Sequence, residues 1–576
     1  MPLTARAHLA LLAAFTVGLA CSGQVGGERP DDEERNASAG ACTAPGANLQ
    51  AILDVGQSLV LCAGQTYDLH APLTFKVAGQ SISTGAASHP RQYATLRIAD
   101  TSVGHAVMSQ GLDNVRLERV VVDGNRQALG PYAGGSFNGG ICTDCYALVL
   151  LVAAQGQTVR HTLLKNTRTW SSLQLHEGQG QCRNGLVENN VVLWAGCDAR
   201  GNGCAPGEPP TKWGDGISIP CRDTVIRNNL VLDATDVGIV LFGAPGSSAE
   251  NNLVASVSRE TFGGVALVDA MDLYALSGSR ANRDVVTDYR GDQVRGNHLR
   301  ALGGRVHIGV AVGPPIWFGP DWLAARSRGA TIADNHLAGD AFGYGFVSNG
   351  SEEVRFEGNQ SGAQHGGDGD GVNGAVAAPA PFLYRPSTTV NPAALQPGFV
   401  AQEALTSLLR LGRCPKSGGF QRCDYTDAEA RGIVRFAYLE ILGREPDAGG
   451  EQHFRQRLLG DRNLTADELR RELMASAEFQ KRSPGVAPAA MQGYRQRLWE
   501  NALLDVLAAD LGGGKPWPSA VSLFDRALAA LAKGAQPAAP PPAPAAVCDP
   551  AAQPAPDWGV KNGQCLRSCG GLGGTS

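Results

Sequence analysis

The chain has 576 residues, a mass of 60.0 kDa and a formal net charge of −5. Hydrophobic residues make up 43% and charged residues 18%, so most of the chain is expected to fold, and the slightly acidic balance argues against a nucleic-acid-binding protein, which usually has a basic face. Gly accounts for 74 residues, nearly twice the usual share of roughly 7%, which indicates many tight corners between short strands.

Residues 1–21 are predicted to be a targeting segment. Arg6 supplies a positive start, and the apolar run Leu9–Leu19 is too short to cross a bilayer. The following Cys21 gives the segment a resemblance to a bacterial lipoprotein signal, which implies that Cys21 carries a lipid; ordinary cleavage before it, giving a secreted protein, is the alternative. Residues 22–40 are predicted to be a flexible tether. Contact with a membrane is therefore expected only through an N-terminal lipid.

The 14 cysteines are expected to form disulfides, because export exposes them to an oxidising compartment. Cys42 and Cys62 bracket one short element, and Cys414 and Cys423 bracket another, so both pairs are predicted to be bonded. Four more surround one insertion, where zinc is the alternative although no His stands at ligand spacing: Cys182, Cys197, Cys204 and Cys221.

An imperfect repeat predicts the fold of residues 41–370. The steps between its recurring asparagines are 24, 39, 23, 45, 38 and 24 residues, which fits a solenoid whose coils number about two dozen residues, with or without a loop. The units contain short alternating strands and no ten-residue amphipathic helix, so we predict a right-handed parallel β-helix with one strand of each sheet per coil and a stacked Asn ladder. The repeated residues are Asn166, Asn190, Asn229, Asn252, Asn297, Asn335 and Asn359.

The start of the solenoid is similar to a known superfamily. Residues 47–55 predict a short capping helix, followed by strands at Leu59–Cys62 and Gln65–Leu69. This opening, together with the early coil at Leu117–Asn125, resembles the pectate-lyase-like β-helix superfamily. The resemblance covers about 330 residues and implies the fold, whereas many activities occur on such scaffolds.

Two aspartates in consecutive coils are candidate catalytic residues. Aligning their strands predicts that Asp215 and Asp236 lie roughly 5 Å apart, close enough for one carboxyl to act as acid and the other as base or nucleophile. The stretch is similar to the polygalacturonase family, in which an Asp-Gly coil precedes an Asp-Asp pair and then a Gly-His-Gly coil. Asp215 and Asp236 match the first two positions, but Val237 replaces the second Asp of the pair, and the nearest histidine, His307, comes a coil late. The alternative is that both aspartates cap corners by binding backbone amides.

Polysaccharide lyases of this fold suggest a second arrangement. They usually hold Ca²⁺ with carboxylates beside an Arg or Lys base, and Asp215, Asp233 and Asp236 could bind Ca²⁺ near Lys212 or Arg227. Ca²⁺ is the one cofactor that this interpretation requires.

Three insertions, at about 195–213, 269–290 and 313–328, are rich in aromatic residues. Trp213, Trp317 and Trp322 are candidate substrate-binding residues, together with Asp233, because aromatic side chains on loops over a rigid scaffold suit stacking on sugars. Packing of each loop onto the coil beneath it is the alternative.

The C-terminal third changes composition. Residues 371–399 are predicted to be a linker, 400–533 a helical domain, 534–547 a Pro/Ala linker and 548–576 a Cys-containing tail. Capping boxes at Thr426 and Thr465 predict two helix starts. Tyr438–Gly449 and Ala475–Phe479 resemble the bacterial domain of unknown function 4214, which implies a helical module of exported proteins and no reaction; there Asp447 and Glu478 are expected to be partners of Arg444.

Together these features predict an all-β solenoid followed by a small α-helical domain, exported and acting on a polysaccharide or cell-surface glycan by hydrolysis or elimination. The alternative is a non-catalytic binding or adhesion protein that uses the β-helix as a rigid scaffold.

Overall fold

The computed structural model describes residues 42–133, 147–176, 180–208, 213–268, 285–318, 322–367, 378–391, 394–403, 425–459 and 464–534. The described residues belong to one compact unit that begins at Cys42. Among their helices, none combines the length and the apolar character needed to cross a membrane.

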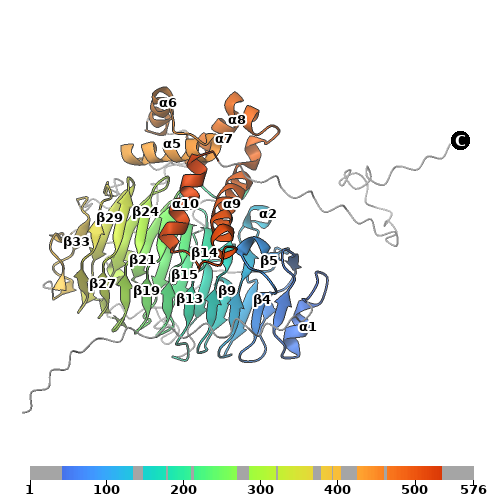
Figure 1. Cartoon of the computed structure of the whole chain (residues 1–576). Coiled ribbons are helices and arrows are strands. Elements are labelled where there is room, and N and C mark those ends of the chain that lie inside the picture. Colours follow the sequence, from blue (N-terminus) through green and yellow to red (C-terminus); the bar gives the residue numbers. More distant parts are fainter. Residues whose placement is uncertain are drawn as a thin grey trace, which may run out of the picture. The chain divides into compact units, whose positions relative to one another are not determined.

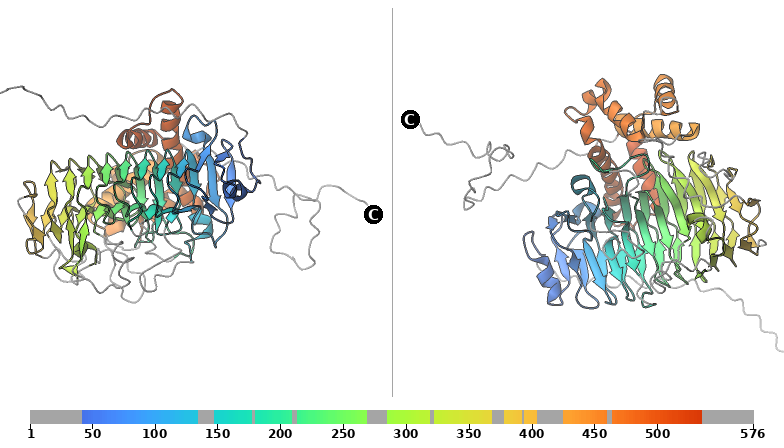
Figure 2. Two further views of the ribbon diagram at one scale, coloured as in Figure 1. Left: turned by 90° about the horizontal axis from the view of Figure 1, so that it is seen from below. Right: turned by 180° about the vertical axis from the view of Figure 1, so that it is seen from behind.

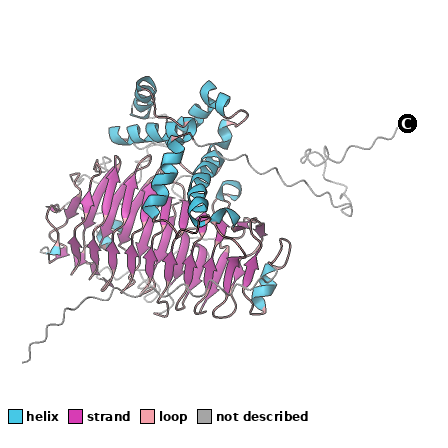
Figure 3. Ribbon diagram, viewed as in Figure 1, coloured by secondary structure: helices cyan, strands magenta, loops and turns pink. Residues whose placement is uncertain are grey.

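Three parallel sheets run along the solenoid and confirm the predicted β-helix (Figures 1 and 3). We call them sheets A, B and C; the coils from β1 to β33 each contribute one strand to each sheet, and Figure 2 shows the stacked strands from below and from behind. Sheet A contains β1 (Leu59–Leu61), β4 (Ser81–Thr84), β7 (Arg116–Glu118), β10 (Thr158–Arg160), β13 (Leu186–Glu188), β16 (Val225–Arg227), β19 (Ser248–Glu250), β23 (Gln293–Arg295), β27 (Thr331–Ala333) and β31 (Arg355–Glu357).

Sheet B contains β2 (Thr66–Leu69), β5 (Ala94–Ile98), β8 (Val120–Asp123), β11 (Leu163–Lys165), β14 (Val191–Ala195), β17 (Leu230–Ala234), β20 (Leu253–Ser256), β24 (His298–Ala301), β28 (His336–Gly339) and β32 (Gln360–Ser361). Sheet C contains β3 (Leu73–Thr74), β6 (Val107–Gln110), β9 (Ala147–Val152), β12 (Ser171–His176), β15 (Asp215–Ile219), β18 (Val237–Leu241), β21 (Thr261–Leu267), β25 (Val306–Val312), β29 (Phe342–Ser348), β33 (Phe382–Tyr384) and β35 (Val400–Ala401). A fourth sheet widens the later coils with β22 (Val286–Asp288), β26 (Arg326–Arg328), β30 (Ser351–Glu352) and β34 (Thr389–Val390).

The predicted asparagine ladder is present, with one correction. From Asn190 to Asn359, each Nδ2 donates to the Oδ1 of the next ladder residue at 2.9–3.0 Å, and Gln396 ends the row. Asn166 was wrongly included: it follows β11 and donates to Asp123, whereas every ladder residue directly precedes a strand of sheet B. In that coil Thr162 holds the position and binds the Asn190 side chain.

The residue before each ladder position explains the recurring Asn-Asn and Gly-Asn pairs. Asn189, Asn228 and Asn251 have φ of 56°, 53° and 54°, and Gly296 and Gly358 have φ of 65° and 66°. This left-handed conformation is accessible to Gly and tolerated by Asn, and it turns the chain at the corner so that the following Asn side chain points into the stack. In each pair, the first residue forms the corner and the second contributes the side chain of the asparagine ladder.

A helix closes the N-terminal end of the solenoid, and further strands extend it at the other end. The predicted capping helix is α1 (Leu49–Asp54), with Asn48 as its N-cap, and the Cys42–Cys62 disulfide ties the segment before it to β1. At the other end, part of the segment predicted to be a linker forms β33 and β34, which pair with the preceding coil. That segment is rich in Ala and Pro, but Phe382 stacks on Phe346 at 5.1 Å between ring centroids and so continues the core.

The helical region contains α5 (Asp427–Leu442), α6 (Ala448–Leu459), α7 (Ala466–Ala475), α8 (Ala477–Arg482), α9 (Met491–Leu511) and α10 (Ala520–Ala532). Both predicted capping boxes form, at Thr426 with Glu429 and at Thr465 with Glu468. The single helix expected after Thr465 is divided at Ser476, which ends α7 and caps α8. Short helices elsewhere are α2 (Arg126–Leu129), α4 (Pro314–Phe318), and the 3₁₀ turns η1 (Pro90–Gln92) and η5 (Pro488–Ala490).

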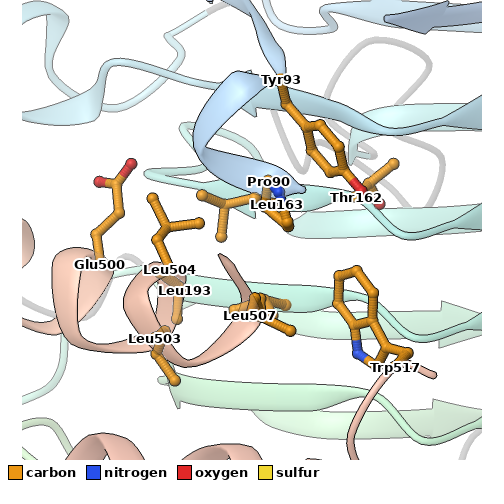
Figure 4. Close-up of a pocket in the computed structure, with 11 residues that line it drawn as sticks. Pro90, Tyr93, Thr162, Leu163, Leu193, Glu500, Leu503, Leu504, Leu507 and Trp517 are labelled. Atoms are coloured by element: carbon orange, nitrogen blue, oxygen red, sulfur yellow. The ribbon is translucent and has the colours of Figure 1, made fainter. Parts of the chain in front are cut away.

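Three hydrophobic cores are present. The first fills the solenoid, the second lies between the outer face of sheet B and the helices, and the third contains buried residues of β18, β21, β25 and β29 in sheet C, with Trp170 packed against it. Figure 4 shows this seam, where Leu503 and Leu507 of α9 face Leu163 and Leu193 across a small cavity of about 10 Å³. Because the central strands of sheet B, from β11 to β20, bury apolar side chains on both faces, the helices share a core with the solenoid. Trp194 of β14 is buried in this second core.

Candidate functional site

Asp215, the first predicted catalytic residue, is at the start of β15 and is almost completely buried. Its Oδ1 accepts a hydrogen bond from the backbone N–H of Val237 at 3.0 Å, and its Oδ2 accepts one from the Ser218 hydroxyl at 2.9 Å. The Ser218 hydroxyl oxygen also lies 2.9 Å from the Ser171 hydroxyl on the preceding strand of sheet C. The carboxylate therefore joins three adjacent strands, which is the capping role that the sequence left open.

Asp236 is not the register partner of Asp215. Ile217 pairs with Ile239, so Asp215 is level with Val237, and Asp236 stands one residue earlier, just before β18. The Asp236 side chain is partly exposed, and its Oδ2 lies 3.4 Å from the indole nitrogen of Trp170. The sequence alignment was therefore one residue out, which separates the proposed acid pair along the strand direction.

Asp233, proposed to bind substrate or Ca²⁺, is completely buried at a corner with φ of 55°. Its Oδ1 accepts the backbone N–H groups of Val257 and Ser258 at 2.8 and 2.9 Å, and that of Arg259 at 3.3 Å. Its Oδ2 accepts the Ser258 hydroxyl. These bonds use both oxygens to hold the next coil, as a corner cap does.

His307 is buried beside Glu260 and Phe262. The closest His307 nitrogen to Glu260 is 3.8 Å from its carboxylate, and the His307 ring is 5.2 Å from that of Phe262. Phe262 in turn makes an edge contact with Trp213 at 4.7 Å between centroids. Trp213 and His307 are thus brought together through Phe262, in a packed column that the sequence did not predict.

The remaining predicted residues divide between described and other parts of the chain. Trp322 is partly exposed, and Arg227 pairs with Glu188 on sheet A at 2.7 Å. The Trp317 side chain, Lys212, Cys414, Cys423 and Cys21 lie outside what the structure describes. Tyr289, in another aromatic insertion, is buried and donates its hydroxyl to the Leu241 carbonyl, which is a packing role.

A polar row on sheet C escaped the sequence interpretation. Gln174 of β12 is in register with Ser218 of β15, and its amide is 3.1 Å from His176 on the same strand. Within the described part of the chain, the buried polar atoms near this region that have no hydrogen-bond partner include Ser172 Oγ, Gln174 Oε1 and Trp213 Nε1. With Trp170 and Asp236, these groups combine aromatic surface with unused hydrogen-bonding capacity. The alternating Ser171–His176 pattern, with polar residues in a buried strand, was the available signal.

Disulfides account for the four cysteines for which zinc was the alternative: Cys182 bonds Cys221 and Cys197 bonds Cys204. Across the described ranges, no three or more His, Cys, Asp or Glu side chains gather in a way that could hold a metal ion. Asp233, the most enclosed of the suggested Ca²⁺ ligands, already binds three amides.

The disulfide-closed loop 197–204 carries contacts to the helices. Gly203 donates its N–H to Asp467 at 3.1 Å, and Asn202 accepts the Asp467 N–H at 3.2 Å. Arg200 bridges Glu260 of the solenoid and Glu429 of α5 at 2.9 and 3.1 Å. Burial disfavours a charge on Glu429, but Arg305 and Arg200 outweigh it and hold its pKa at about 2.

A second buried ion cluster binds the helices to one another. Glu440 accepts hydrogen bonds from Arg470 at 2.7 Å, Arg495 at 2.9 Å and Trp499 at 2.8 Å. Outside the core, Arg444 forms the predicted pair with Glu478, at 2.6 and 2.8 Å. These charged side chains therefore have structural partners within the helical region.

Comparison with protein-family models and with curated proteins found no match, so the resemblance to domain of unknown function 4214 stays a prediction. Solved structures give weak similarities. The catalytic domain of a GH87 α-1,3-glucanase in complex with nigerose has a TM-score of 0.33 and 9% identity over 64% of this chain and 68% of that one. A surface adhesin of Streptococcus pneumoniae has a TM-score of 0.34 and 10% identity over 54% and 84%. The mannuronan C-5 epimerase AlgE6 A-module of Azotobacter vinelandii has a TM-score of 0.26 and 15% identity over 62% and 94%. Similarities this low leave the activity of the chain open.

Proposed function

We propose that the protein is an exported polysaccharide-binding β-helix protein, whose ligand lies beside the partly exposed Trp170 and Asp236, which directly precede β12 and β18 of sheet C. The observation that carries the proposal is the Trp170–Asp236 pair: an indole ring directly before β12, packed against Phe242 and hydrogen-bonded to a partly exposed carboxylate. Sugars are bound by aromatic faces together with precisely directed polar groups, and the partly exposed His176 at the end of β12 provides a further polar group on the same strand.

Binding is favoured over catalysis because the acid pair is incomplete. Asp215 accepts a backbone amide and a hydroxyl, which supports a structural carboxylate. Asp233 is similarly occupied. Retaining and inverting glycosidases both need two carboxyl groups at a defined separation, and Asp236 alone supplies one. Hydrolysis or elimination remains the second candidate, favoured by the partial exposure of Asp236 and carrying Asp236 and His307 as its catalytic groups, with Ca²⁺ as the cofactor in the eliminating case.

A polysaccharide panel tests both candidates on the mature protein, with and without Ca²⁺. Binding would be measured by affinity electrophoresis, and turnover by new reducing ends and by the ultraviolet absorbance of unsaturated products. We expect retention on at least one polysaccharide without products. Trp170→Ala should weaken that binding at least tenfold, or about 1.4 kcal/mol, and the matched control Asp68→Asn, an exposed carboxylate on sheet B, should leave it unchanged.

The outcomes separate the candidates. Products that disappear in Asp236→Asn while binding persists would establish the enzyme. Asp215→Asn is expected to lower stability through its bond to Val237, so a stable but inactive Asp215→Asn protein would restore the catalytic pair. Equal binding by wild type and Trp170→Ala would remove the proposed face.

The localisation of the protein is a separate proposal with its own support. The three disulfides of the described residues are typical of an exported protein. We propose that Cys21 is lipid-modified, so that the solenoid is displayed from a membrane surface, with the helical region as a module similar to domain of unknown function 4214. Mass spectrometry of the mature N-terminus distinguishes an acylated Cys21 from ordinary cleavage before it.

A further inference from the structure

Two histidines form a pair on the outer face of sheet B. His298 begins β24 and His336 begins β28, and the two residues are direct register partners on adjacent parallel strands. Their rings lie 4.9 Å apart between centroids and are nearly parallel, with an interplanar angle of 19°. Both side chains are partly exposed.

The position of the pair is defined by its register neighbours. Leu253, on the strand before His298, is buried in the core shared with the helices, whereas Gln360, on the strand after His336, is exposed. The histidines therefore lie at the edge of the buried part of sheet B. Their rings are accessible to a solute from solvent, and the strands that carry them are fixed by pairing on both sides.

We propose that His298 and His336 bind one divalent transition-metal ion of the copper, nickel or zinc class through a nitrogen of each imidazole. Two nitrogens that share such an ion at about 2.0–2.1 Å lie roughly 3 Å apart, and neighbouring strands are about 4.8 Å apart. The imidazole lone pairs lie in the planes of the two stacked rings, so both side chains turn about their own torsions to direct one nitrogen each at the ion, while the paired strands keep the backbone in place. Imidazole is the preferred side-chain ligand for these ions.

The surroundings decide what kind of site this is. No third His, Cys, Asp or Glu completes a ligand group with the pair among the described residues, so water fills the other coordination positions and the site is open. Asp525 of α10 lies close to His298 and pairs with Arg300, two residues further along the same strand. Its carboxylate offsets the positive charge of Arg300 and gives the ion a nearby anion.

Nickel chloride titrated into the mature, disulfide-intact protein by calorimetry is the test, after free thiols are alkylated so that cysteine cannot compete. We expect one equivalent to bind, His298→Asn and His336→Asn each to lower its affinity at least tenfold, and the double variant to lose it. His70→Asn, an isolated exposed histidine that follows β2, is the matched control and should keep it.

A second measurement covers the case in which a variant folds poorly. One equivalent of Cu²⁺ bound to the wild-type protein should give an electron paramagnetic resonance spectrum with splitting from two nitrogen ligands. A spectrum without nitrogen splitting, an unchanged stoichiometry in the folded double variant, or no Ni²⁺ bound by wild type at millimolar metal would each overturn the proposal.

Discussion

The asparagine ladder gives the most direct test of how this solenoid is held together. The Asn252 side chain is completely buried and makes four hydrogen bonds: it accepts the backbone N–H and the Nδ2 of Asn229, both at 2.9 Å, and donates to the Ile226 carbonyl at 2.9 Å and to Asn297 Oδ1 at 3.0 Å. Asn252→Ala removes all four at once. At about 1 kcal/mol net for each bond, the expected loss in unfolding free energy is about 4 kcal/mol.

The neighbouring residue supplies a matched control. Asn251 is exposed and has φ of 54°, so Asn251→Gly keeps the corner conformation and removes no buried side chain. Its effect should stay within about 0.5 kcal/mol. Equilibrium unfolding in guanidinium, followed by circular dichroism, measures both variants.

Two outcomes would contradict this role of the asparagine ladder. A loss below about 1 kcal/mol for Asn252→Ala would mean that water or a shifted neighbour replaces the ladder bonds at little cost. An equal loss in Asn251→Gly would place the stabilisation in the corner conformation. Asn252→Asp keeps the acceptor and removes the donor, so it should be at least as destabilising as the alanine variant.

Three further predictions concern buried charges and a disulfide. Burial above all raises the pKa of Asp292 to about 9. The stability that this carboxyl contributes is therefore complete below about pH 4, and it falls by about 1.4 kcal/mol per pH unit until pH 9. Asp292→Asn should abolish that slope in urea unfolding measured at pH 5 to 8. Burial opposes the charge of Glu440, but Arg470 and Arg495 outweigh it and hold its pKa at about 2, so Glu440→Gln should cost about 3–5 kcal/mol above pH 5 by calorimetry, and a loss under 1 kcal/mol would contradict the ion cluster. Replacing Cys197 and Cys204 together by Ser should cost about 2.5 kcal/mol from the short loop they close and speed hydrogen exchange at the start of α7, whereas exchange confined to the loop would show that the loop does not hold the helix.

Local sequence patterns were sufficient to predict the coils of the β-helix and the N-caps of two helices. Asn residues at the corners, short alternating strands and Gly-rich turns recur once per coil. This regular repeat in the sequence predicted the β-helix and most of the asparagine ladder. The capping boxes at Thr426 and Thr465 were equally readable, because their hydrogen bonds join residues three positions apart. Asn166 was misassigned because spacing alone does not distinguish the two ends of a strand of sheet B.

Only the tertiary structure decided which residues face one another. A shift of one residue in register placed Asp236 beside Trp170 instead of level with Asp215, and periodicity cannot fix register to that accuracy when loops of different length separate the coils. The packing of the helices against sheet B depends on side chains more than 200 residues apart, such as Arg200 and Glu429, whose attraction no local pattern records. The sequence by itself determined how each coil is made, and long-range packing determined which coil positions are buried, paired or left open to a ligand.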